Sequence, residues 1–234
     1  ADWIFALVRT STEGKKQEGI SFLLIDMSTP GLEVKPIISM DGGHYLNEVF
    51  FVDVKVPVTN RIGEENMGWT YAKYLLGHER TGIAGVAKSK RKLEKLKEIA
   101  GLEQDSGEPL IDDPDFKSRV ANVGIKLQAL EITNLRTLSA VSAGKSPGDA
   151  SSILKIRGTE VEQELNELLV RAMGYYAHPY QPGRLFNQQT NMIPVGPDHA
   201  VGLMEERLLR RAASIYGGSN EIQKNIIAKA IMGL

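Results

Sequence analysis

One segment near the C-terminus combines residue types that could bind an anionic ligand. Residues 215–233 read IYGGSNEIQKNIIAKAIMG, which predicts a helix ending at Tyr216, a turn at Gly217 and Gly218, and a new helix capped by Ser219. Paired glycines allow the backbone to approach a ligand closely, and the N–H groups at a capped helix N-terminus attract phosphate or another anion. The same pattern is typical of an ordinary helix–helix turn, so both interpretations stay open on the residues alone.

The other residues that could do chemistry form no metal or nucleophile pattern. The sequence contains no cysteine, which excludes disulfides, a thiolate nucleophile and a zinc–thiolate cluster, and its four histidines lack metal-ligand spacing. We therefore predict no metal site. On the residues alone, Glu79 is one of 29 acidic residues and reads most simply as part of a solvated helix face.

The composition excludes several classes of protein. Of the 234 residues, 42% are apolar, which is too many for a disordered chain. The 28 basic residues are balanced by 29 acidic ones, which leaves no electrostatic footprint for nucleic acid or an anionic membrane. No apolar run approaches the roughly 20 residues that a membrane helix needs. The absence of cysteine suits a reducing compartment, so we expect a cytoplasmic protein.

Hydrophobic patterning predicts strands early in the chain and helices after them. Short apolar or β-branched runs, separated by turns that contain glycine or proline, predict four strands. These strands cover residues 3–8, 20–25, 32–38 and 47–56. Amphipathic stretches predict five helices. These helices cover residues 67–99, 114–143, 151–173, 201–214 and 219–232, and a long irregular loop covers residues 177–200.

Two of the predicted helices have recognisable apolar faces. Asp113 and Pro114 form a helix start, with the aspartate as N-cap and the proline at the first position. The apolar residues that follow recur at steps of four and three: Phe116, Val120, Val123, Leu127 and Leu130. The apolar side predicted for the helix over 151–173 consists of Ile153, Ile156, Leu165, Leu168, Leu169 and Ala172.

Together these elements predict an α+β fold that is mainly α. Residues 1–60 are expected to form part of an antiparallel β-domain, and residues 61–234 a helical bundle. Four strands are too few to close a barrel, and the chain opens directly on an apolar strand. We therefore expect it to be a fragment of a longer protein.

Two stretches carry a resemblance to a known family. Residues 30–69, PGLEVKPIISMDGGHYLNEVFFVDVKVPVTNRIGEENMGW, and the segment IYGGSNEIQ resemble the acyl-CoA dehydrogenase family of flavoproteins in order and spacing. The resemblance implies a fold with an N-terminal helical domain, a middle β-domain and a C-terminal helical bundle. This chain would then hold the end of the second domain and all of the third.

The resemblance also implies a reaction, a cofactor and partners. The family removes two hydrogens from the α and β carbons of an acyl-CoA thioester: a glutamate takes the α-proton and the β-hydrogen passes as hydride to N5 of FAD. The base needs a pKa raised by a water-poor pocket, because the α-proton is weakly acidic. Electrons pass on to an electron-transfer flavoprotein, and the expected assembly is a homo- or hetero-tetramer packed through the C-terminal bundle.

Site residues follow from the resemblance position by position. Many members carry the base directly after the signature tyrosine, where this chain has Gly217. The segment Leu75–Arg80 resembles a second pattern, in which the base lies on the first long helix of the C-terminal domain. The resemblance therefore implies Glu79 as catalytic base, with substrate-binding residues Arg80, Tyr216 and Gly217.

The implied FAD-binding residues are Ser219, Glu221 and Gly174. The chain departs from the family pattern at two places. An expected FAD-binding Arg-Phe-Gly is absent from residues 98–110, and Gly174 is the one remnant of a glycine-rich flavin loop in residues 171–183. With these departures and the long loop 177–200, the chain resembles members that act on less usual acyl chains, such as dicarboxylyl or ring-bearing ones.

Two other functions remain open on the sequence. With glycine at position 217, the chain could be a non-catalytic partner subunit of a heteromeric acyl-CoA dehydrogenase. It could also be a fold relative that works as an oxidase or a flavin monooxygenase.

Overall fold

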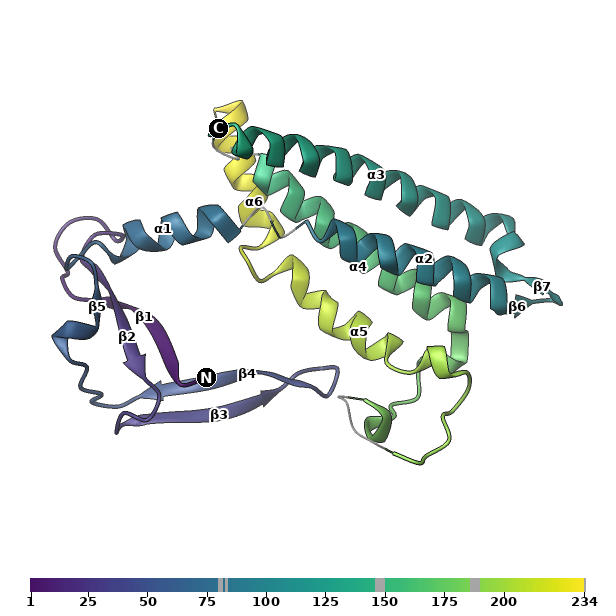
Figure 1. The fold of residues 1–234 in the computed structure, drawn as a ribbon, viewed down its shortest axis with the longest axis horizontal. Helices are drawn as coiled ribbons and strands as arrows, with labels where there is room; N and C mark the ends of the chain where they lie inside the picture. The colour runs from purple at the N-terminus through teal and green to yellow at the C-terminus, as the bar shows by residue number, and fades with distance from the viewer. Residues whose placement is uncertain (80–81, 83, 146–149, 186–189, 234) are drawn as a thin grey trace. The chain divides into compact units, whose positions relative to one another are not determined.

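The computed structural model describes residues 1–79, 82, 84–145, 150–185 and 190–233. The chain divides into two compact units (Figure 1). The first consists of Ala1–Ile38 and His44–Glu79, and the second of Ser39–Gly43 and Arg80–Leu234. The predicted boundary between residues 60 and 61 refers to the domains of the resembled family. The compact units are a different division of the chain, so this boundary stays a prediction.

The first unit contains the four predicted strands in two antiparallel sheets. Strand β2 (Ile20–Asp26) lies between β1 (Trp3–Arg9) and the short β5 (Arg61–Ile62). Strands β3 (Leu32–Ile38) and β4 (His44–Phe51) form a separate hairpin. The fourth strand was predicted to reach residue 56, which is wrong. It ends at Phe51 because the backbone turns away at Asp53, whose φ of 52° is incompatible with strand pairing.

The helix α1 (Gly68–Glu79) belongs to the first unit because it packs on β2. Gly68 allows this contact. A Cβ atom at this position would lie 2.6 Å from the carbonyl carbon of Ser21 and 2.8 Å from the amide nitrogen of Phe22. A one-turn 3-10 helix, η1 (Val58–Asn60), precedes β5.

The prediction of one long helix over residues 67–99 is wrong. Helix α1 ends at Glu79, and α2 (Val86–Leu102) begins as a separate helix in the second unit. The residue before α2 is Gly85, with a φ of 59°. A residue in this left-handed region cannot continue a right-handed helix, and glycine enters the region at no steric cost.

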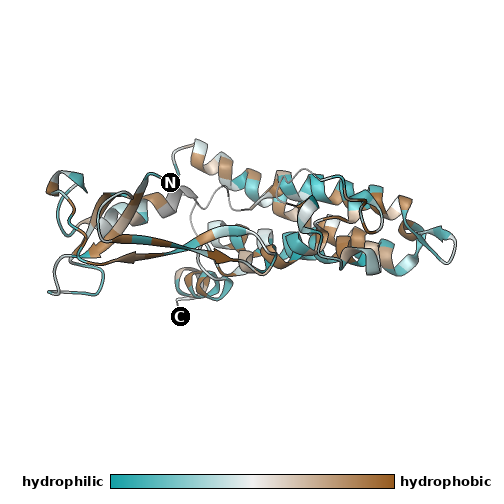
Figure 2. Cartoon of the chain, turned by 90° about the horizontal axis from the view of Figure 1, so that it is seen from below, coloured by the Kyte–Doolittle hydropathy of each residue, from teal (hydrophilic) through white to brown (hydrophobic). Residues whose placement is uncertain are grey.

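The second unit is a helical bundle built around α4 (Ala150–Met173). Helices α2, α3 (Pro114–Ser142), α5 (Leu203–Arg210) and α6 (Asn220–Ile227) all pack on α4 (Figure 1). Apolar and polar residues alternate around the helices in Figure 2, and the apolar sides supply one buried core. Among its members are Leu96, Val123, Leu154, Val161, Leu165 and Leu169.

Short elements connect these helices. A two-stranded hairpin of β6 (Gln104–Asp105) and β7 (Glu108–Pro109) and the 3-10 turn η2 (Leu110–Asp112) join α2 to α3. The described part of the predicted loop 177–200 is irregular apart from brief 3-10 turns, and a further turn follows α5. These turns are η3 (Gly174–Ala177), η4 (Pro182–Arg184), η5 (Asp198–Ala200) and η6 (Arg211–Ser214). A π-helical turn, η7 (Ala228–Met232), follows α6.

The start and apolar face predicted for α3 are confirmed. The carboxylate of Asp113 accepts a hydrogen bond of 2.7 Å from the amide of Phe116, and Pro114 is the first helical residue. All five predicted apolar residues of this helix are buried. On α4 the predicted face is wrong at Ile153, which is 38% exposed. The polar residues Ser152 and Lys155 are buried on this part of the helix instead.

Replacing Asp113 with alanine is expected to lower the free energy of unfolding by about 1 kcal/mol, because the amide of Phe116 loses its capping partner. Urea denaturation of both proteins measures this difference. Asp113→Asn is the control, since its side-chain oxygen can still accept the bond and should keep most of the stability. Equal losses in the two variants would show that the cap contributes nothing.

The α+β fold that is mainly α is thus confirmed. Within the described ranges, no helix combines the length and the apolar character that crossing a bilayer requires.

Candidate active site

The segment 215–223 forms the predicted turn between two helical elements. Gly217 and Gly218 have φ values of 65° and 82°, a region that side-chain-bearing residues rarely adopt. The hydroxyl oxygen of Ser219 accepts a hydrogen bond of 3.3 Å from the amide of Ile222 and so caps α6. The stretch Tyr216–Ser219 is called the signature loop below.

The signature loop is open to a ligand. Tyr216, Gly217 and Gly218 are exposed, and so is Glu221 in the first turn of α6. The loop therefore presents an aromatic ring, a bare stretch of backbone and a helix N-terminus on one accessible surface. These groups suit a ligand that is partly planar and partly polar.

A cavity of about 190 Å³ lies next to Tyr216 within the second unit. It is bordered by the start of α2, by Gly158 and Thr159 of α4, and by Arg210. Gly158 allows the close approach of the segment before α2, because a Cβ atom there would lie 2.7 Å from the carbonyl oxygen of Ala84. The cavity is smaller than the roughly 300 Å³ at which drug-sized ligand sites begin, so it can hold a small group only.

Arg210 places a positive charge at the edge of this cavity. Its guanidinium lies 3.2 Å from the Glu162 carboxylate, and Tyr216 borders the same cavity. Burial by itself lowers the pKa of Arg210, but Glu162, Tyr216 and Glu206 raise it above the usual value. Arg210 therefore stays charged at the edge of the cavity that Tyr216 also borders.

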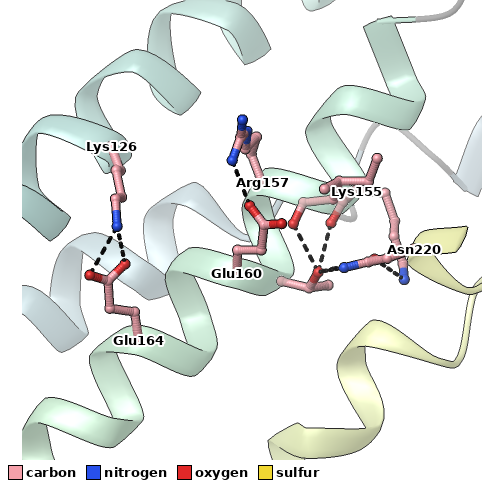
Figure 3. Close-up of polar contacts among 8 residues, drawn as sticks. Lys126, Lys155, Arg157, Glu160, Glu164 and Asn220 are labelled. Carbon is pink, nitrogen blue, oxygen red and sulfur yellow. Dashed lines mark hydrogen bonds and ion pairs between the residues drawn. The ribbon is translucent and has the colours of Figure 1, made fainter. Parts of the chain in front are cut away.

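Beneath the signature loop lies a cluster of buried polar side chains that the sequence analysis missed. Lys155 of α4 is 1% exposed, and its ammonium donates a hydrogen bond of 2.8 Å to Oδ1 of Asn220, the first residue of α6 (Figure 3). One turn away, the Ser152 hydroxyl donates a bond of 2.8 Å to Oε1 of Gln223. Burial lowers the pKa of the Lys155 ammonium, and the charge of Glu221 partly offsets this shift.

A sequence signal for this cluster existed. Ser152, Lys155 and Thr159 follow each other at steps of three and four, so they share one face of α4. Asn220 and Gln223 repeat the step of three on α6. Matching polar faces on two helices indicate a polar contact between them. A single lysine in a helix is usually exposed to solvent, so Lys155 by itself does not indicate this contact.

The structure does not bring all the predicted site residues together. Tyr216, Gly217, Ser219 and Glu221 share the signature loop and the first turn of α6. Gly174 follows the far end of α4, 15 residues beyond Thr159, which corresponds to roughly 22 Å along the helix axis. These residues therefore cannot all touch one small group.

The predicted catalytic residues fall on a part of the chain that is only partly described. Glu79 is the last residue of α1, and its side chain lies outside the described residues, as does Arg80 altogether. Among the residues that the structure does describe, no three His, Cys, Asp or Glu side chains gather as they would around a metal ion.

Comparisons with known proteins agree with the resemblance. Residues 66–232 match the family model described as "Acyl-CoA dehydrogenase, C-terminal domain". The whole chain is 33% identical to acyl-CoA dehydrogenase FadE26 of Mycobacterium tuberculosis and covers 57% of it. It also superposes entirely on the ChsE4–ChsE5 complex from Mycobacterium tuberculosis, with a TM-score of 0.81, 29% identity and 57% of that chain covered.

A third comparison shows the fold alone. The structure entitled "PigA with FAD and proline" has a TM-score of 0.79 at 22% identity, with 98% of this chain and 56% of that one covered. The chain thus spans little more than half the length of these relatives. The family model covers most of the chain, and the chain therefore belongs to the acyl-CoA dehydrogenase family.

Proposed function

We propose that this chain is part of an FAD-dependent enzyme that dehydrogenates an acyl-CoA thioester between its α and β carbons. The observation that carries the proposal is the signature loop: two glycines with positive φ, an exposed tyrosine and a serine-capped helix, in a chain that belongs to the family. Its exposed backbone suits the close approach of substrate and cofactor.

In this proposal the Glu79 carboxylate removes the α-proton of the thioester. Gly217 has no side chain and so cannot take a proton, which leaves the other family position for the base. Arg80 and Tyr216 are the proposed substrate-binding residues, and Gly217, which has no side chain, leaves room for the substrate at the signature loop. For this proton transfer Glu79 must be held away from water, because desolvation raises the pKa of a carboxyl group toward neutrality.

The residues of the signature loop fit a dinucleotide in part. Ser219 and the N–H groups at the start of α6 suit its polar portion, and the Glu221 carboxylate suits ribose or adenine donors rather than phosphate. Gly174 would contact another part of the cofactor, since α4 separates it from the loop. Bound FAD would supply the two-electron acceptor for the β-hydrogen.

The proposed partners are an acyl-CoA substrate and an electron-transfer flavoprotein, in the cytoplasm. The proposed assembly is a homo- or hetero-tetramer packed through the bundle. An apolar stripe on the outer side of α3 supports this packing, because Ile125, Ile132, Leu135 and Leu138 are all 42% exposed or more. The acyl group we propose is dicarboxylyl or ring-bearing.

One observation favours a second function. Glycine at position 217 removes the base from the place where many family members carry it, and one structural relative is a complex of two different chains, ChsE4 and ChsE5. The alternative is that this chain completes a heteromer whose catalytic base lies on the other subunit.

The visible spectrum of the full-length protein tests the proposal. We expect a flavin spectrum that loses its absorbance when an acyl-CoA panel is added without oxygen, with the ring-bearing or dicarboxylyl members acting fastest. A flavin that no acyl-CoA reduces would contradict catalysis by this chain and favour the partner-subunit function. Oxygen consumption with peroxide formation would instead identify an oxidase.

A further inference from the structure

We propose that Lys155 is a positioning residue, which fixes the signature loop through its hydrogen bond to Asn220. The inference deepens the proposed function and rests on it for its consequence in catalysis. The effect of Lys155 on the positions of Gly217, Gly218 and Ser219 does not depend on the proposed activity.

The first step is the position of Asn220. This residue comes directly after the capping Ser219, so any movement of Asn220 moves the cap and the two glycines before it. Asn220 is 8% exposed, and the Thr159 hydroxyl oxygen lies 3.4 Å from both Oδ1 and Nδ2 of its side chain. Oδ1 also accepts the shorter bond of 2.8 Å from the Lys155 ammonium (Figure 3).

A second anchor lies one turn before Lys155 on α4 and one turn after Asn220 on α6. Ser152 donates to Oε1 of Gln223, and Nε2 of Gln223 lies 3.5 Å from the carbonyl oxygen of Gly218. Gln223 thus connects α4 to the loop itself. The two hydrogen bonds join residues three positions apart on each helix. Together they fix the position of α6 along α4 and the rotation of α6 about its own axis. They thereby also fix the path of the signature loop.

Burying an ammonium group at this position costs more free energy than burying an apolar side chain. Lys155 is withdrawn from water beneath the N-terminus of α6, where the helix dipole also disfavours a positive charge. A methionine of similar length would fill the volume without this penalty. What the ammonium adds is a strong donor for Asn220, and that points to a positioning role rather than to plain packing.

The test uses the full-length protein and its Lys155→Met variant. The first readout is hydrogen exchange of the backbone amides over residues 215–223. We expect exchange there to become about tenfold faster, the factor that the loss of one hydrogen bond to a charged group allows. Exchange in α2 and α3 should stay the same. Arg157→Met is the control, because it removes an exposed cation of the same helix, whose contact drawn in Figure 3 is with Glu160.

The second readout separates positioning from stability. We expect Lys155→Met to melt no earlier than the parent while kcat falls about tenfold and flavin absorbance shifts. Asn220→Asp should keep the parent behaviour because its oxygen still accepts from Lys155. Asn220→Leu should melt earlier than Lys155→Met, because it leaves the ammonium buried without its acceptor. In the double variant, exchange in the loop should be no faster than in Lys155→Met.

The outcomes distinguish the two proposals. Unchanged exchange in the loop of Lys155→Met, or faster exchange throughout the bundle, would overturn the positioning role whatever the activity. If Lys155→Met fails to fold, the Lys155→Met/Asn220→Leu double variant supplies the same comparison, because neither the ammonium nor the amide is then left without its partner. A third outcome is that no acyl-CoA reduces the flavin of the parent protein, while Lys155→Met speeds hydrogen exchange in the signature loop alone. In that case the proposed function fails and the positioning role stands.

Discussion

Replacing Glu79 with glutamine in the full-length enzyme is expected to reduce turnover by about 10²- to 10⁴-fold while FAD stays bound. Glutamine has nearly the shape of glutamate but cannot accept the α-proton, so substrate binding should change little. Rates under anaerobic conditions with a saturating acyl-CoA measure the chemical step, and the flavin spectrum of the purified variant measures cofactor content.

Glu64→Gln is the control for this experiment, because it removes an exposed carboxylate of the same compact unit. It should leave turnover unchanged. Full turnover in the Glu79→Gln variant would rule out Glu79 as the base. If the chain works in a heteromer and that assembly keeps its activity after the substitution, the partner-subunit function is the better account.

Shortening Leu165 to alanine should have the largest effect on stability. Leu165 is 0% exposed at the middle of α4, the helix on which the other helices of the bundle pack. The substitution removes buried methyl groups and leaves a cavity, which costs about 2–5 kcal/mol of unfolding free energy. Chemical denaturation followed by far-ultraviolet circular dichroism measures the loss.

Leu102→Ala makes the matched comparison. Leu102 ends α2 and is 69% exposed, so the same deletion of atoms should change the unfolding free energy by only about 0.5 kcal/mol. Similar losses at the two positions would show that α4 is not the centre of the folded core.

The elements that could be predicted from the sequence are those whose determining interactions are local. The cap at Asp113, the proline after it and the apolar steps along α3 lie within one helix, so the pattern alone specifies the element. The break between α1 and α2 was missed because no proline marks it. It depends on the left-handed backbone of Gly85, and glycine alone is a weak signal for ending a helix.

The same distinction applies to the site. The turn at Gly217 and Gly218 and the cap at Ser219 were predictable, since all three are neighbours in sequence. The burial of Lys155 was not, because its partner Asn220 lies 65 residues further along the chain. A charged residue in a helix is usually solvated, and only the tertiary contact overrides that expectation.

The separation of 65 residues between Lys155 and Asn220 also bears on the order in which parts of the chain fold. Helices α2, α3 and α4 follow one another in sequence and pack together, so short connections bring them into contact. The bonds from α4 to α6 close a stretch of 65 to 71 residues, and longer closures cost more chain entropy. We therefore expect the signature loop to take its final shape late, after α2, α3 and α4 have packed together.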